Sequence, residues 1–195
     1  MALMKVLIYP DRFLRKKVDR VENVDDEIRT LLEDMAETMY AAPGVGLAGT
    51  QVGVNKRVIV VDFPVHDEDD TDESVGWAED KDGNRLEGLL SIVNPEIKDF
   101  AKDEITWEEG CLSIPGVYED VKRPVGVTVT GLDPSGKEII VHAVGFPAVE
   151  LQHEIDHLDG ILFIDRLMPV KRRLVKKRLD KAVAEGNYPP PPSDE

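Results

Sequence analysis

The chain has very little cysteine and no long hydrophobic run. Cys111 is the only cysteine in 195 residues, which excludes an internal disulfide. No segment reaches the roughly 20 consecutive apolar residues that a membrane-spanning helix needs, and the first residues lack the cationic start and apolar stretch of a secretory signal. We therefore expect a cytoplasmic protein in a reducing compartment, where Cys111 persists as a free thiol or thiolate.

Positive charge is also scarce, because the formal net charge is −15. This balance argues against a general nucleic-acid-binding surface, so we expect neither DNA nor a membrane among the partners. The length suits one domain with its own core, and we predict a single catalytic domain over residues 1–187. Ten acids against two bases give residues 64–88 a charge of −8, which is typical of a solvated, mobile insert loop. Residues 188–195 are rich in proline and are expected to form an extended or disordered tail.

The most informative segment is His153-Glu154-Ile155-Asp156-His157. On a helix, positions i and i+4 lie on one face about 6 Å apart, so both imidazoles can reach one ion. Cys111 can supply a third ligand and leave the fourth position for water, as in catalytic metal sites. Glu154 then lies beside the ion, where it can take a proton from activated water and pass it to a leaving group. The residues indicate a hydrolase with one divalent metal ion per chain.

The helix that carries this motif has clear ends. Pro147 suits the first turn and Gly160 suits the position just beyond the last turn. Leu151, Ile155 and Leu158 recur at spacings of four and three, which predicts a buried stripe beside the histidine face. An ordinary amphipathic helix with two incidental histidines is the plainer alternative.

The remaining pattern favours an α+β fold. A helix is predicted to begin at Asp25-Asp26 and to end before Pro43, and a second helix carries many cations near the C-terminus. Between them, strands are predicted at 57–63, 89–93, 104–114, 125–130 and 138–144. We expect mixed or antiparallel strands packed around a central metal-binding helix, with an N-terminal and a C-terminal helix outside them.

The C-terminal basic helix has a partial apolar face. Leu167, Leu174 and Leu179 are expected to form that face, and the cations predict either docking to an anionic surface or a plain solvated face. The cations are Lys171, Arg172, Arg173, Lys176, Lys177, Arg178 and Lys181.

Three segments, taken together and in order, resemble the signature motifs of the peptide deformylase family. They are Gly44-Val45-Gly46-Leu47-Ala48-Gly49-Thr50-Gln51, Glu109-Gly110-Cys111-Leu112-Ser113 and Gln152-His153-Glu154-Ile155-Asp156-His157. The similarity extends to Tyr9-Pro10-Asp11 and to residues 159–166. Gly49 departs from the alanine that is more usual in the family, which is expected to loosen the loop that positions Gln51.

This resemblance implies an enzyme of protein biosynthesis that removes the formyl group from the N-terminal methionine of newly made proteins and releases formate. It implies Fe²⁺ as the metal, although Zn²⁺, Ni²⁺ or Co²⁺ can occupy a thiolate and two imidazoles. It assigns the Gln51 side chain and the Leu112 backbone N–H as donors to the formyl oxygen, and it places the Gly46 backbone along the substrate. Val45, Leu112 and Val149 are expected to line the methionine pocket. The implied partners are nascent N-formylmethionyl peptides and, through the basic helix, the ribosome.

Two charged residues are expected to support the metal helix, and three alternatives stay open. Asp156 is predicted to pair with Arg123 and so to steady the helix. A zinc-dependent endopeptidase of the His-Glu-x-x-His type is the nearest enzymatic alternative. A structural metal site would need a fourth ligand, for which His142 is the best candidate. A cysteine nucleophile with a histidine base is the third alternative.

Overall fold

The computed structural model describes residues 2–65 and 75–189, which form helices and strands in an α+β arrangement. The helices are α1 (Asp26–Ala41), α2 (Phe146–Leu158) and α3 (Pro169–Ala184), with short 3₁₀ turns η1 (Arg12–Arg15), η2 (Gly49–Val52) and η4 (Phe163–Asp165). The strands are β1 (Gly46–Ala48), β2 (Val58–Phe63), β3 (Gly76–Asp80), β4 (Gly88–Phe100), β5 (Glu104–Glu109), β6 (Glu119–Pro124), β7 (Gly126–Leu132) and β8 (Glu138–Gly145).

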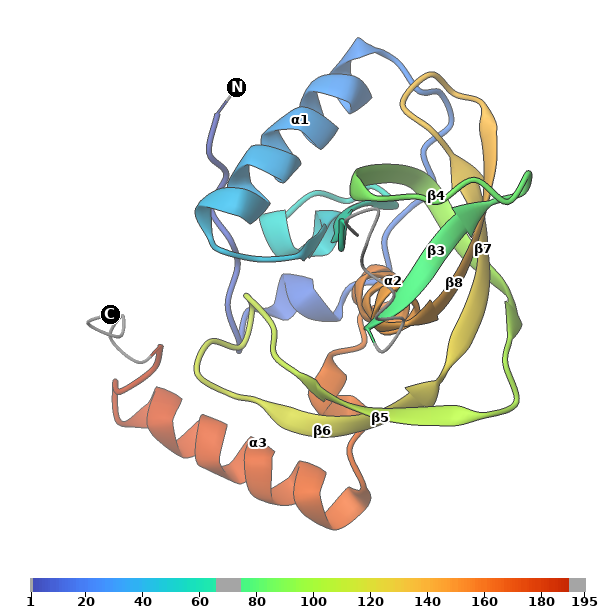
Figure 1. Ribbon diagram of the computed structural model, residues 1–195. Coiled ribbons are helices and arrows are strands. Elements are labelled where there is room, and N and C mark those ends of the chain that lie inside the picture. The colour runs from blue at the N-terminus through green and yellow to red at the C-terminus, as the bar shows by residue number, and fades with distance from the viewer. Residues whose placement is uncertain (1, 66–74, 190–195) are drawn as a thin grey trace.

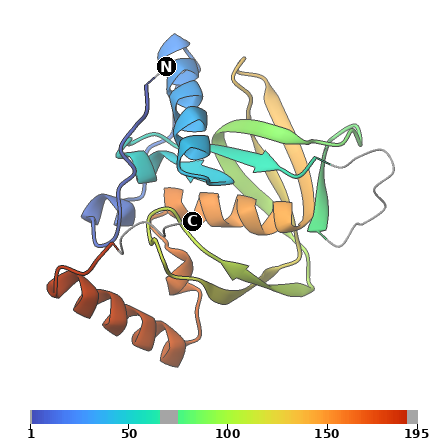
Figure 2. The ribbon, with the colours of Figure 1, turned by 60° about the vertical axis from the view of Figure 1, so that its left-hand side comes forward.

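The strands form two antiparallel units with α2 between them. Six strands pair in the order β1-β2-β4-β7-β8-β3, and β5 pairs with β6 in a separate two-stranded ribbon. Figure 1 shows α2 end-on at the centre, with the large sheet curving around one side and the β5-β6 ribbon beneath. Turned by 60°, α2 is seen along its length in the same central position (Figure 2). The predicted α+β fold, with strands around a central helix and a helix near each end, is confirmed.

The first helix follows from its cap and its apolar stripe. The Asp25 carboxylate accepts a hydrogen bond from the Ile28 N–H at 3.0 Å, which satisfies one of the unpaired donors of the first turn. Ile28, Met35 and Met39 are buried in a cluster that includes Val58 and Val60 of β2. This packing holds β2 and the preceding glycine-rich segment against α1.

The central helix begins and ends where the sequence predicts. Pro147 lies in its first turn, and Gly160 beyond its end has φ +73°. A side chain at Gly160 would place its Cβ 2.4 Å from the Arg15 carbonyl oxygen, so this close approach requires glycine. The predicted stripe of Leu151, Ile155 and Leu158 is buried as expected, but the rest of the helix from Pro147 to Leu158 is buried as well, which the sequence pattern did not predict. The sheet covers one side of α2 and other segments cover the rest, so its polar side chains face the interior.

Several strand boundaries differ from the predicted ones. Gly76–Asp80 form β3 and pair with β8, although residues 64–88 were expected to be an insert loop; residues 66–74 of that insert lie outside the described part. The strand predicted over 104–114 ends at Glu109, which leaves Cys111 in a turn. Glu119–Pro124, for which the sequence pattern predicts no strand, pairs with β5 across its whole length. Four of these six residues are charged and Val121 is the one aliphatic residue, so pairing with β5 rather than a local pattern decides their conformation.

The C-terminal helix packs on the outside of the molecule (Figure 1). Its buried residues are Val175 and Leu179, whereas Leu174 is 59% exposed. The prediction that Leu174 contributes to the apolar face is therefore wrong, while Leu167, just before the helix, and Leu179 are buried as expected. Tyr188, where the tail was expected to start, packs against the same apolar cluster as Leu179, and residues 190–195 lie outside the described range. Among the described helices, none has the length and apolar character that crossing a membrane requires.

Candidate metal centre and active site

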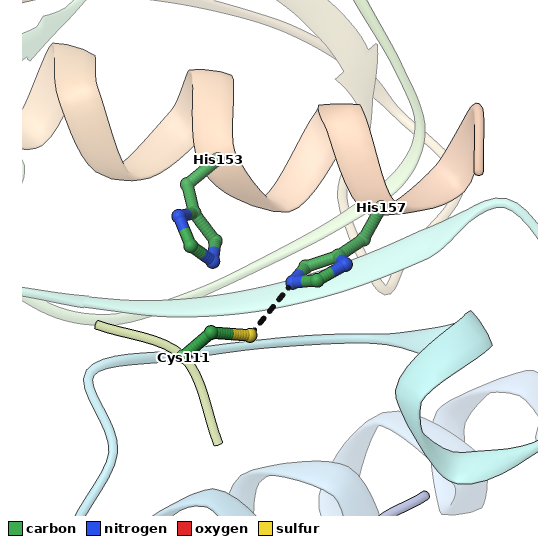
Figure 3. Close-up of side chains that lie close together, drawn as sticks. All are labelled: Cys111, His153 and His157. Carbon is green, nitrogen blue, oxygen red and sulfur yellow. Dashed lines mark hydrogen bonds between the residues drawn. The ribbon is translucent and has the colours of Figure 1, made fainter. Parts of the chain in front are cut away.

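Cys111, His153 and His157 meet in one place. The two imidazoles project from α2 toward the turn that follows β5, where Cys111 lies (Figure 3). Their candidate ligand atoms lie within 4.8 Å of one another, and the Cys111 Sγ is 3.2 Å from the His157 Nε2. Spacing along one helix face brings the two histidines together, and the long connection from β5 to α2 brings the cysteine to them.

The donor chemistry of this cluster fits a divalent transition metal. Burial lowers the pKa of His157 well below its usual value, so its ring is neutral, as a metal ligand must be. His153 is held differently, because its Nδ1 lies 2.7 Å from the Glu109 Oε2. A carboxylate on Nδ1 fixes the ring orientation and leaves Nε2 for an ion. Burial would lower the pKa of His153, but the Cys111 sulfur and Glu109 raise it well above the usual value. A metal cation bound to the His153 ring would therefore take the place of the proton that these negative groups favour.

A buried network of ion pairs connects α2 to Glu109 of β5, Arg123 of β6 and Arg166. Arg123 contacts both Glu109, at 2.9 Å from Nη2 to Oε2, and Asp156, at 2.8 Å from Nη1 to Oδ2. Arg166 reaches Asp156 as well, with its Nε 3.0 Å from Oδ2. Burial alone would raise the pKa of Glu109, but hydrogen bonds from His153 and Arg123 lower it to about 2. The network therefore keeps Glu109 ionised against the His153 ring.

Glu109 was not predicted to act in the site, although it begins the cysteine motif. The sequence signal was a carboxylate two residues before the candidate ligand. The Arg123 and Asp156 side chains, by contrast, form the pair that was expected of them. The Glu109 carboxylate contacts His153 because of the way β5 packs beside α2. The motif alone does not predict which histidine it contacts.

Glu154 lies buried beside the cluster. It is 4% exposed, and its Oε2 has no hydrogen-bond partner among the described residues. Burial raises the pKa of Glu154 to about 7, which suits a group that must both accept and release a proton near neutrality. The backbone of Gly46 comes so close that an added Cβ would lie 2.5 Å from the Glu154 Oε1. Glycine at position 46 therefore lets β1 pass directly over the carboxylate.

The Gln51 side chain is fixed next to the cysteine. Its Oε1 accepts a hydrogen bond from the Ala48 N–H at 2.7 Å, which orients the amide. Its Nε2 lies 3.6 Å from the Cys111 Sγ and 3.3 Å from the Ser113 Oγ. A neutral donor at this place can reach a negative oxygen without competing for the ion.

A cavity of about 450 Å³ opens beside these groups. Its lining includes all four residues expected to contact substrate, namely Val45, Gly46, Leu112 and Val149. Aromatic residues also line it, namely Trp107, Tyr118 and Phe146, and so do the acidic residues Glu108, Glu109, Glu150 and Glu154. Trp107 and Phe146 are in contact, with ring centroids 5.5 Å apart, and so brace one wall.

His142 is not part of the cluster. It lies on β8, where its Nδ1 is 3.0 Å from the Thr128 Oγ1. Within the described residues, the group able to hold a metal consists of Cys111, His153 and His157. The proposed fourth ligand of a structural site is therefore not brought to the other three.

Gly49 is tightly packed. Its carbonyl oxygen accepts from the Val54 N–H at 2.8 Å, and an added Cβ would lie 2.6 Å from the Lys56 carbonyl oxygen. In this chain an alanine there would require the segment before β2 to move. Whether glycine loosens the loop around Gln51 stays a prediction.

Comparison with known proteins gives consistent matches over most of the chain. Residues 3–173 match the model of the polypeptide deformylase family. A peptide deformylase from Syntrophobacter fumaroxidans is 45% identical over 185 residues, which cover 95% of this chain and 98% of that protein. The crystal structure of peptide deformylase from Ehrlichia chaffeensis has a TM-score of 0.80 at 38% identity and covers 95% of this chain and 99% of that one. A peptide deformylase structure from Legionella pneumophila has a TM-score of 0.76 at 41% identity, with 97% and 100% covered.

Proposed function

The chain belongs to the polypeptide deformylase family of metal-dependent hydrolases, which remove the N-formyl group from nascent peptides, and on this premise we propose which of its residues carry out the reaction. Cys111, His153 and His157 hold the ion, and Glu154 moves the proton. The observation that carries the assignment is the meeting of one sulfur and two ring nitrogens beside a buried carboxylate at a cavity.

The ion, when bound, supplies a Lewis acid that activates water and polarises the formyl carbonyl. Glu154 accepts a proton from the attacking water on a carboxylate oxygen. Water oxygen then bonds to the formyl carbon, the C–N bond breaks, and Glu154 returns the proton to the departing amine nitrogen. The products are formate and a free N-terminus. A carboxyl group with a pKa of about 7 suits both transfers.

Gln51 and Leu112 stabilise the oxygen that becomes negative during attack. The Gln51 Nε2, held by the Ala48 contact, and the Leu112 backbone N–H donate to it. Donors that are already oriented need no rearrangement when charge develops, and removing one such donor typically costs about 10² to 10³ in turnover. Glu109, Arg123 and Asp156 act indirectly, by holding the His153 ring and the end of α2.

The substrate lies along β1 with its first side chain in the cavity. The Gly46 backbone passes over Glu154, so a chain beside it would bring its formyl group to that carboxylate. Val45, Leu112 and Val149 provide apolar walls for a methionine side chain. The aromatic pair Trp107 and Phe146 adds to the same surface.

Iron(II) is the proposed native metal. A thiolate with two imidazoles also suits zinc, nickel or cobalt, so the donor set alone does not choose among them. Purification without oxygen, elemental analysis and a formate-release assay on a formyl-methionyl tripeptide test the proposal together. We expect one equivalent of iron and turnover that falls when the protein is exposed to air or chelator. Stoichiometric zinc with full activity would overturn the choice of iron, and cleavage of internal bonds without formate release would overturn deformylation.

The basic face of α3 is the proposed contact with the ribosome in the cytoplasm. Arg172, Arg173, Lys176 and Lys177 surround a groove on this face, and cations there suit an RNA-rich surface. Replacing Arg173, Lys176 and Lys177 by Gln should weaken cosedimentation with ribosomes while turnover of a tripeptide stays unchanged. Replacing Lys5, Lys98 and Lys102, which lie outside α3, is the matched control. Equal cosedimentation of both triple variants would overturn the contact.

A further inference from the structure

Glu150 is a third buried acid at the cavity, besides Glu109 and Glu154, and the mechanism does not use it. It lies on α2 one helical turn before Glu154, is 4% exposed, and lines the same cavity. Its Oε1 accepts a hydrogen bond from the Asp62 N–H at 3.3 Å. Its Oε2 is buried without a partner among the described residues. One end of this carboxyl group is therefore satisfied and the other is not.

Burial decides the protonation state of this group. A carboxylate with a bare oxygen in an apolar surrounding is costly, and such a group takes up a proton instead. Burial and then the charge of Glu154 raise the pKa of Glu150 well above its usual value. Since Oε1 accepts from a backbone N–H, the proton resides on Oε2. Glu150, which lines the cavity, thus carries one O–H donor that has no partner among the described residues.

The hydrogen bond from β2 to α2 does not explain why residue 150 is an acid. The Asp62 N–H already donates to the Val45 carbonyl oxygen at 2.8 Å, which is shorter than its 3.3 Å contact with Glu150. The strand is therefore held without the acid. An apolar side chain would fill the same space at no cost in unpaired polar atoms, so the carboxyl group is expected to have a partner that arrives with the substrate.

We propose that Glu150 is a specificity-determining residue, which donates a hydrogen bond to the sulfur of the substrate methionine. The proposal rests on the proposed function, because it needs the first side chain of a formyl peptide in this cavity. Val149, the adjacent residue on α2, is one of the walls assigned to that side chain. A thioether sulfur is a weak acceptor. A site that offers a buried donor selects against a substrate that lacks the acceptor, because the donor then stays unpaired.

Norleucine provides the test, since it replaces the sulfur by a methylene of similar size. The values of kcat/KM for formyl-Met-Ala-Ser and formyl-norleucine-Ala-Ser are compared by formate release. The wild-type protein should prefer methionine by about three- to five-fold, which is the range of one modest hydrogen bond. Glu150→Leu should lose this preference. Glu150→Gln is the matched control, because its amide keeps an acceptor for the Asp62 N–H and a donor for the sulfur, and it should retain the preference.

The outcomes separate this inference from the function on which it rests. A preference that persists in Glu150→Leu, or a wild-type ratio close to one, would overturn the role of Glu150 while leaving deformylation intact. Formate release from neither peptide would overturn the proposed function itself. A thermal unfolding curve of each variant shows that the compared proteins are folded, so the two ratios refer to the same cavity.

Discussion

The central helix α2 and the outer helix α3 are of similar length but place their charges in opposite settings. All residues of α2 from Pro147 to Leu158 are buried, and three of them are acids. In α3 the buried residues are Val175 and Leu179, and its cations project outward. A charge in the interior must find a partner or change its protonation state, whereas a charge on the surface needs to do neither because water solvates it. The groups with altered protonation therefore lie on α2, whereas α3 presents its charges at the surface of the protein.

The largest expected effect comes from removing the carboxylate on α2 that moves the proton. Glu154→Gln keeps the shape but cannot accept a proton, so kcat/KM for a formyl-methionyl tripeptide should fall by about 10² to 10⁴. The metal content should be unchanged, because Glu154 is not a ligand. Lys176→Gln on α3 is the matched change of one charge and should leave tripeptide turnover as it was. A loss of less than about tenfold in Glu154→Gln would remove Glu154 from its assigned role.

The next largest effect concerns the ion pairs behind α2. Arg123→Met leaves Glu109 and Asp156 buried without their shared partner, and breaking a buried pair in this way typically costs about 3 to 5 kcal/mol. Urea unfolding measures the loss. Arg178→Met on α3 is the control, because Arg178 is mostly exposed and lies 3.7 Å from Glu119. Such surface pairs contribute about 0 to 1 kcal/mol, so similar losses in both variants would contradict the contrast between the helices.

The sequence predicts much of α2 because its local signals agree with its tertiary role. Pro147 and Gly160 mark its ends, and the spacing of His153 and His157 fixes their common face. The position of Cys111 follows from no local rule, since a turn after β5 brings it across from another part of the chain. Only the combination of motifs predicted that these three residues meet.

Other parts of the site depend on packing that no local pattern encodes. Glu109 and Glu150 look like ordinary acids in the sequence, yet both are buried at 4% exposure. Their roles depend on which strand passes which face of α2. The same limit explains β6 and β3, which become strands because a partner strand lies beside them. The sequence likewise did not predict that α2 is buried on all sides, because its polar residues resemble those of a helix face exposed to solvent.

The third prediction distinguishes the two faces of α3. Leu179 is 2% exposed in a cluster with Leu14 and Phe163, whereas Leu174 is 59% exposed. Leu179→Ala should destabilise the protein by about 2 to 3 kcal/mol through lost burial and the cavity left behind. Leu174→Ala deletes the same atoms at the surface and should change the free energy of unfolding by less than about 0.5 kcal/mol. If the two substitutions had equal effects, the assignment of Leu179 to the face of α3 that packs against the protein would be wrong.

The smallest expected effect comes from a single hydrogen bond that joins the N-terminal segment to α3. The Tyr9 Oη donates to the Asp180 Oδ1 at 2.6 Å, and burial together with this bond raises the pKa of Tyr9 to about 12. Tyr9→Phe should cost about 1 kcal/mol at neutral pH. Since the folded state favours the neutral phenol, the bond stabilises the protein fully below pH 10, the usual value for tyrosine, and its contribution should disappear as the pH rises to about 12.

The difference between wild type and Tyr9→Phe isolates this contribution from the other tyrosines. Urea unfolding at pH 7, 10 and 11.5 measures it, and the difference should shrink over the two alkaline points. Asp180→Asn removes the carboxylate but keeps an acceptor, so it should lower the pKa of Tyr9 and shift the loss to lower pH. A difference close to zero at all three pH values would show that α3 is held without this bond, by its apolar face and its other polar contacts. A constant non-zero difference would contradict the predicted dependence on the ionisation of Tyr9.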